Sequence, residues 1–245
     1  MNVSNAIIHI AHDSAELGNI AAAYWCRQAR NAIEDHGAFY VTLSGGSTPR
    51  LLFERLASPA YRNAIDWTKV FVLFGDERCV PADHEDSNYR MAREALFQPL
   101  GIADSHVFRI ETERGPEGAA LAYGETLKRV LPDNGLDLVM LGLGPDGHIA
   151  SLFPGTPALS EELAAVVPVF VEKFSSWRIS ITFPVLAQAR RIMLLTAGEG
   201  KAGIVSEILD KESSHEPYPV EMIRARDQID FFMDRPAAAR LEAGN

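Results

Sequence analysis

An apolar run that stops abruptly at a glycine- and proline-rich turn limits the fold of this chain more than any other feature. The run covers residues 136–143, and its length and composition are typical of a strand buried in a parallel sheet. The turn at residues 144–148, Gly-Pro-Asp-Gly-His, places Asp146 two residues before His148. Ligands of open α/β sheets bind beyond the carboxyl ends of the strands, and histidine exchanges protons near neutral pH, so both side chains are candidate catalytic groups. The alternative is that His148 only caps the next helix or bonds a carbonyl group.

Strands and helices alternate along almost the whole sequence. Apolar segments typical of strands lie at residues 6–11, 38–43, 70–74, 136–143, 164–171, 178–183, 192–196 and 229–233. Helical patterns lie at residues 14–34, 49–56, 89–97, 118–130 and 201–209. Because strands joined through helices are parallel, we predict an α/β fold: a doubly wound, mainly parallel sheet with helices on both faces, of the Rossmann-like kind. No repeat, low-complexity tract or long linker divides the 245 residues, so we expect one domain over residues 1–245.

Composition and charge exclude several classes of partner. A net charge of −10 argues against nucleic acids and anionic membranes, which attract positive surfaces. No apolar segment approaches the roughly 20 residues that span a bilayer, and residues 1–5 lack the basic start of a secretory signal. The two cysteines, Cys26 and Cys79, provide no disulfide framework, so we expect a reducing, cytoplasmic setting. No Cys and His cluster has the spacing of metal ligands, so no metal site is expected.

A small phosphorylated ligand remains compatible with this charge, because it needs only a few local cations and backbone N–H groups. Residues 44–49, Ser-Gly-Gly-Ser-Thr-Pro, lie between a predicted strand and a predicted helix. Ser47 or Thr48 is a natural N-cap, Pro49 suits the first helical turn, and the helix dipole favours an anion there. The alternative is a tight turn with ordinary capping. The residues expected to form this anion-binding turn are Ser44, Gly45, Gly46 and Thr48.

Three basic residues stand near predicted strand ends. Arg78 closes the segment Gly-Asp-Glu-Arg, where it suits a bidentate contact with phosphate, while Asp76 or Glu77 could orient sugar hydroxyls or hold a cation. Lys201 opens a predicted helix, where an anionic partner would relieve its conflict with the helix dipole. Arg178 opens a strand and faces either the site or solvent. The alternative for all three is a solvated charge with ordinary ion pairs.

Taken in order, these segments resemble the 6-phosphogluconolactonase family. The matching segments lie at residues 43–49, 75–81, 87–88, 141–155, 178–182, 198–201 and 231–234, and together they cover nearly the whole chain. Each motif alone is weakly specific, but their shared order and spacing are highly specific. One segment departs from the family pattern: Phe-Ser-Ser-Trp at residues 174–177 replaces the proline-rich approach to Arg178 that family members often carry.

The resemblance implies hydrolysis of 6-phospho-D-glucono-1,5-lactone to 6-phosphogluconate in the oxidative pentose phosphate pathway, with no required metal or organic cofactor. In that reaction His148 is expected to act as the general base that activates water, and Asp146 to orient it. The substrate phosphate is assigned to Arg78 and Lys201, with Arg178 as a third candidate. Backbone N–H groups near Gly45 or Gly144 are the candidates for stabilising the oxyanion.

Two alternatives come from other functional classes. The first is a deaminase or isomerase of glucosamine 6-phosphate, which resembles the lactonases in fold but has a glutamate where this chain has Phe153. Because phenylalanine cannot carry a proton, this residue favours the lactonase. The second is a non-catalytic sugar-phosphate-binding protein. Such proteins usually carry a DNA-binding module as well, but this chain has neither spare length for one nor a basic recognition segment. The sequence does not specify an oligomeric state.

Overall fold

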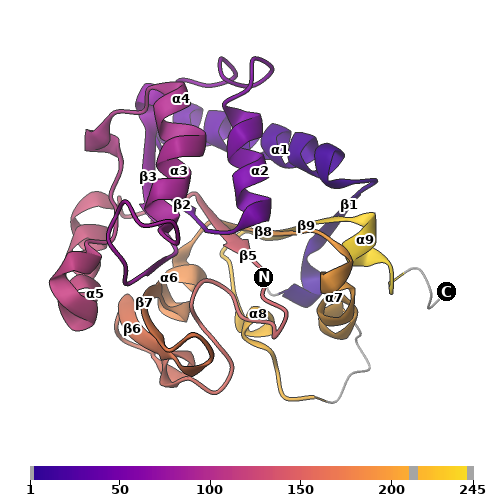
Figure 1. Ribbon diagram of the computed structural model, residues 1–245. Coiled ribbons are helices and arrows are strands. Elements are labelled where there is room, and N and C mark those ends of the chain that lie inside the picture. The colour runs from indigo at the N-terminus through magenta and orange to yellow at the C-terminus, as the bar shows by residue number, and fades with distance from the viewer. Residues whose placement is uncertain (1–2, 210–214, 242–245) are drawn as a thin grey trace.

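Two sheets organise the chain in the computed structural model, which describes residues 3–209 and 215–241 (Figure 1). The larger sheet has the strand order β1-β9-β8-β5-β2-β3, and every neighbouring pair is parallel. The predicted mainly parallel α/β sheet is therefore confirmed. In the order of the sheet, its strands are β1 Ile7–Ala11, β9 Gln228–Asp234, β8 Arg191–Thr196, β5 Leu138–Gly142, β2 Phe39–Leu43 and β3 Val70–Phe74.

Helices cover both faces of the larger sheet (Figure 1). Helices α1 (Ser14–His36) and α2 (Ser47–Leu56) lie on one face, and α7 (Ala202–Leu209) and α8 (Pro219–Met222) lie on the other. Strand β5 between these layers is almost wholly buried, as its apolar run predicts. The remaining helices are α3 Asn88–Ala92, α4 Gln98–Leu100, α5 Gly115–Val130, α6 Phe183–Gln188 and α9 Arg235–Ala238.

The order of the strands reverses between β2 and β5. From β2 the chain passes through α2 to β3 on one side, whereas from β5 it continues to β8 on the other side. At such a switch point the two loops diverge and leave a crevice at the carboxyl ends of the strands, which is the usual ligand position in this kind of sheet. The loop that follows β2 and the loop that follows β5, which carries His148, therefore meet there.

A second, antiparallel sheet stands against the end of β3. It contains β4 (Asp76–Arg78), β7 (Ser176–Ile181) and β6 (Val166–Val171), with β7 in the middle. Sequence patterns did not separate these strands from the parallel sheet. Gly75 joins the two sheets, because its N–H donates to the Leu43 carbonyl at 2.9 Å and its carbonyl accepts from the Ile181 N–H at 2.9 Å. The small sheet is thereby fixed beside the crevice.

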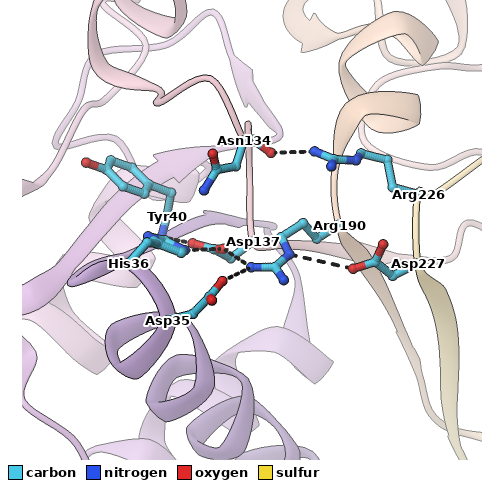
Figure 2. Close-up of polar contacts among 8 residues, drawn as sticks. All are labelled: Asp35, His36, Tyr40, Asn134, Asp137, Arg190, Arg226 and Asp227. Atoms are coloured by element: carbon cyan, nitrogen blue, oxygen red, sulfur yellow. Dashed lines mark hydrogen bonds and ion pairs between the residues drawn. The ribbon is translucent and has the colours of Figure 1, made fainter.

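A network of charged side chains lies at the other end of the large sheet from the crevice, where the strands begin (Figure 2). Arg190 Nη1 lies 3.0 Å from a carboxylate oxygen of Asp35 and 3.7 Å from one of Asp137, and its Nε lies 3.6 Å from Asp227. The buried Asp137 also lies 2.9 Å from Nε2 of His36. Because each of these charges has a partner, the network links the end of α1 to the starts of the strands and has a structural role.

Candidate active site

A cavity of about 210 Å³ lies at the switch point. It gathers seven of the nine residues that the sequence predicted for the site. The other two do not line it. Thr48 lies in the first turn of α2, and Asp146 contacts His148 without lining the cavity itself. The lining residues are Ser44, Gly45, Gly46, Asp76, Arg78, Asn88, Gly142, Leu143, Gly144, Pro145, His148, Ala150, Arg178 and Lys201.

His148 and Asp146 form a closely bonded pair, with Nδ1 of the imidazole 2.5 Å from Oδ1 of the carboxylate. Burial lowers the pKa of His148, and the hydrogen bond and charge of Asp146 only partly oppose this effect. Burial disfavours the Asp146 carboxylate, but the hydrogen bond and charge of His148 outweigh it and lower the pKa of Asp146. At neutral pH the imidazole is therefore neutral, donates its Nδ1–H to an ionised carboxylate, and keeps a lone pair on Nε2. Among the residues that the structure describes, Nε2 has no hydrogen-bond partner.

Two contacts fix the plane of this imidazole. Phe153 stacks on it, with ring centroids 3.9 Å apart and 24° between the ring planes. On the loop itself, a Cβ at Gly144 would stand only 1.9 Å from Nδ1 of His148. Only glycine therefore leaves room for the imidazole at this position.

The turn after β2 differs from its prediction in how α2 is capped. The helix begins at Ser47, and Gly46 is its N-cap, with a φ of +108°. The prediction that Ser47 or Thr48 caps the helix is wrong, because the chain enters α2 through a backbone conformation that only glycine adopts without strain. No side chain caps α2, so its first N–H groups remain available to a ligand.

Backbone N–H groups near the cavity are not equivalent. Gly144 donates its N–H to the carbonyl of His148 at 2.8 Å. In contrast, the N–H groups of Gly45 and Gly46 have no acceptor within residues 3–209 and 215–241. Gly45 also lies against Asn88, since a Cβ there would stand 1.8 Å from the amide oxygen. Of the two loops, the one after β2 therefore offers free donors to a bound ligand.

Three cations reach the cavity from different elements. Arg78 and Arg178 are paired across β4 and β7, and Lys201 lies just before α7. The Lys201 ammonium donates to the Leu143 carbonyl at 2.7 Å, and Arg78 Nη1 donates to the Asp86 carbonyl at 2.6 Å. The Arg178 guanidinium has no hydrogen bond or ion pair to any described residue, and burial lowers its pKa. An anion in the cavity would supply the partner that this guanidinium lacks.

The two acids of β4 have different surroundings. The buried Glu77 accepts hydrogen bonds from the N–H groups of Arg78, Asn88 and Tyr89 and from the Ser87 hydroxyl. Burial raises the pKa of Glu77, against the effect of these N–H donors. Its oxygens are thus used to fix β4 to the start of α3, and Glu77 does not line the cavity. Asp76 instead lines the cavity, where it accepts from the Ser151 hydroxyl at 2.6 Å.

Asp76 and Asn88 line the cavity without having been chosen as site residues. Asp76 is one of the two acids that the sequence offers for sugar hydroxyls or a cation, and Asn88 lies in the segment at residues 87–88 that matches the family. Within the described part of the chain, no group of three or more His, Cys, Asp or Glu side chains is placed to hold a metal ion. Nor does any described helix have the length and apolar character needed to cross a bilayer.

Comparisons with known proteins agree on one family. The family model described as glucosamine-6-phosphate isomerases/6-phosphogluconolactonase matches residues 12–231. A probable chloroplastic 6-phosphogluconolactonase 3 of Oryza sativa subsp. indica is 39% identical over 241 residues, which cover 93% of this chain and 73% of the rice protein. The 6-phosphogluconolactonase of Haemophilus influenzae is 37% identical over 82% of this chain and 87% of its own length. The structure of 6-phosphogluconolactonase from Trypanosoma brucei superposes with a TM-score of 0.86 at 29% identity, covering 97% of this chain and 99% of that one.

Proposed function

Because this chain belongs to the glucosamine-6-phosphate isomerase and 6-phosphogluconolactonase family, we propose that His148 and the neighbouring cations carry out hydrolysis of 6-phospho-D-glucono-1,5-lactone. The enzyme is a carboxylic ester hydrolase, and its product is 6-phosphogluconate. The observation that carries the assignment of residues is a neutral imidazole held by Asp146 in the same cavity as an unpaired guanidinium, that of Arg178. The first group suits proton transfer, and the second suits a phosphate.

In the proposed mechanism, Nε2 of His148 takes a proton from water as the water oxygen bonds to the lactone carbonyl carbon. The tetrahedral intermediate then collapses: the bond from this carbon to the ring oxygen breaks, and the imidazolium returns the proton to the departing oxygen. Asp146 stabilises the imidazolium between the two transfers and keeps the proton of the neutral ring on Nδ1. The enzyme neither gains nor loses a proton over the cycle.

The loop after β2 is the better candidate for stabilising the oxyanion. The Gly45 N–H is free among the described residues, whereas that of Gly144 is already donated to His148. A donor without a competing acceptor stabilises developing charge without first breaking a bond. We assign the phosphate to Arg178, Lys201 and Arg78, so that binding energy remote from the reacting carbon fixes the carbonyl group near His148.

A paired assay tests this function against its alternatives. Fresh 6-phosphogluconolactone, with its spontaneous hydrolysis subtracted, should be hydrolysed by the enzyme, and glucosamine 6-phosphate should release no ammonia. The stacked ring of Phe153 supports this expectation, because it occupies the position of the glutamate in the deaminase pattern. Ammonia release would favour the deaminase, and binding of substrate without turnover in either assay would favour a non-catalytic sugar-phosphate-binding protein.

The pH dependence follows from the state of His148. Its pKa lies below the ordinary value of 6.5 because the imidazole is buried, and only the neutral form accepts a proton. kcat/KM should therefore be level at neutral pH and fall about tenfold per pH unit below a midpoint that is itself below 6.5. The Asp146→Asn variant should move this midpoint to still lower pH, because the carboxylate raises the pKa of His148. A pH profile of kcat/KM for both proteins measures the shift, and a midpoint that moves upward in the variant would contradict the assigned pair.

We also propose a place for the enzyme in the cell. Both cysteines are free thiols: Cys26 is buried, and burial raises the pKa of Cys79 to about 11, so this thiol stays protonated and unreactive. Free cysteines suit a reducing compartment, and we propose the cytoplasm and the oxidative pentose phosphate pathway. The rice relative is named as a chloroplastic protein.

A further inference from the structure

The guanidinium of Arg178 lies against two aromatic side chains that also touch each other. Its Cζ is 5.0 Å from the ring centroid of Phe174 and 5.7 Å from that of Phe153. The two rings meet edge to face, with centroids 6.2 Å apart and 70° between their planes. Phe174 belongs to the tip of the β6–β7 hairpin, whereas Phe153 belongs to the loop after β5. The rings therefore approach Arg178 from two separate segments of the chain.

Phe153 makes a second contact, because its ring is the one that stacks on His148. One aromatic side chain thus contacts both the proposed base and the proposed phosphate ligand. Phe153 is 5% exposed and belongs to the core, but Phe174 is 49% exposed. Burial of apolar surface alone does not explain why Phe174 lies over a charged group.

An aromatic face holds a cation without using its hydrogen-bond donors. The ring quadrupole attracts the flat face of a guanidinium, and the N–H groups at its edge remain free. A carboxylate would hold the same group through the N–H groups that a phosphate needs. Arg190 shows this contrast within the same protein, because three aspartates surround its guanidinium (Figure 2). Arg178 has two rings and no hydrogen bond or ion pair to a described carboxylate, and the charges of Asp76, Asp86 and Glu77 act on it only from a distance.

We infer that Phe174 and Phe153 are positioning residues for this reaction: they hold Arg178 over the cavity with its donors free for the substrate phosphate, and Phe153 also sets the plane of His148. The inference rests on the proposed function, since it takes Arg178 as a phosphate ligand. It gives a role to a segment in which this chain departs from the common family pattern, the Phe-Ser-Ser-Trp sequence at residues 174–177.

The Phe174→Leu variant tests the inference with little risk to folding, because the ring is half exposed. KM for 6-phosphogluconolactone should rise about two- to five-fold, the effect of losing one partly exposed cation–π contact, while kcat stays at the wild-type value. Phe174→Tyr, which keeps an aromatic face, should restore KM. Phe170→Leu is the matched control, because Phe170 is an exposed aromatic of the same hairpin that contacts Trp177, and it should change neither constant.

A double-mutant cycle separates this inference from the function on which it rests. In an Arg178→Ala background, Phe174→Leu should raise KM no further, because the group that it positions is gone. An equal rise in both backgrounds, or failure of tyrosine to restore KM, would overturn the inference and leave the role of Arg178 intact. If Arg178→Ala alone leaves KM unchanged, the phosphate assignment itself fails and the inference falls with it.

Replacement of Phe153 should change a kinetic constant that replacement of Phe174 leaves unchanged. Phe153→Leu should lower kcat as well as raise KM, because it removes the surface that sets the plane of His148. Far-UV circular dichroism and thermal unfolding establish whether this core variant is folded. A folded variant with wild-type kcat would remove Phe153 from the positioning of the base, and the Phe174 cycle would still test the positioning of Arg178.

Discussion

Replacement of His148 by alanine should lower kcat for 6-phosphogluconolactone by about 10²–10⁴-fold, the range typical for loss of a general base. KM should stay close to the wild-type value, because the cations assigned to the phosphate lie on other elements. Removing the imidazole leaves the Asp146 carboxylate without its bonded ring, so added imidazole should restore part of the rate. Steady-state and single-turnover hydrolysis, each corrected for spontaneous opening of the lactone, measure the loss.

The matched control for this experiment is His12→Ala, since His12 is an exposed histidine outside the cavity. It should hydrolyse the lactone at the wild-type rate. A His148→Ala protein that is folded and keeps its single-turnover rate would exclude this residue from proton transfer.

The Arg178→Ala variant should raise KM for the phosphorylated lactone by about 10- to 100-fold, the effect of losing charge-assisted hydrogen bonds to a phosphate. The guanidinium makes no hydrogen bond or ion pair with a described residue, so its removal breaks neither and ends only its contacts with the rings of Phe153 and Phe174. Hydrolysis of unphosphorylated glucono-1,5-lactone should change little, because that substrate presents no phosphate. The comparison of kcat/KM for the two lactones isolates this contribution.

A suitable control is Arg109→Ala, because the Arg109 side chain forms an ion pair with Glu113 outside the cavity. This variant should have wild-type kcat/KM for both the phosphorylated and the unphosphorylated lactone. Equal losses with the phosphorylated and unphosphorylated lactones in Arg178→Ala would show that Arg178 acts elsewhere than at the phosphate.

The large sheet could be predicted because its signals are local. The apolar run at residues 136–143 contains the whole of β5, and helical segments between strands require parallel neighbours. The small sheet could not be predicted as a separate unit. Its strand β4 is the charged tripeptide Asp-Glu-Arg, which has no strand pattern and is held by pairing with β7, some 100 residues away.

The candidate site shows the same division between local and distant causes. Strand-end position and side-chain chemistry were enough to select His148, Arg78, Arg178 and Lys201. The choice between Asp76 and Glu77 stayed open, because the groups that donate hydrogen bonds to Glu77 come from the start of α3. Phe153 and Phe174 were missed because apolar residues normally indicate a core, and only the folded structure brings their rings to Arg178.

The way the small sheet is joined through Gly75 has an evolutionary consequence. The proposed base, His148, lies on a loop of the large sheet, while two of the three cations assigned to the phosphate lie on β4 and β7 of the small one. Remodelling of the β6–β7 hairpin can then alter which ligand a descendant recognises, while the machinery that breaks the ester is inherited unchanged. In such an architecture, selectivity and reactivity can diverge as separate traits.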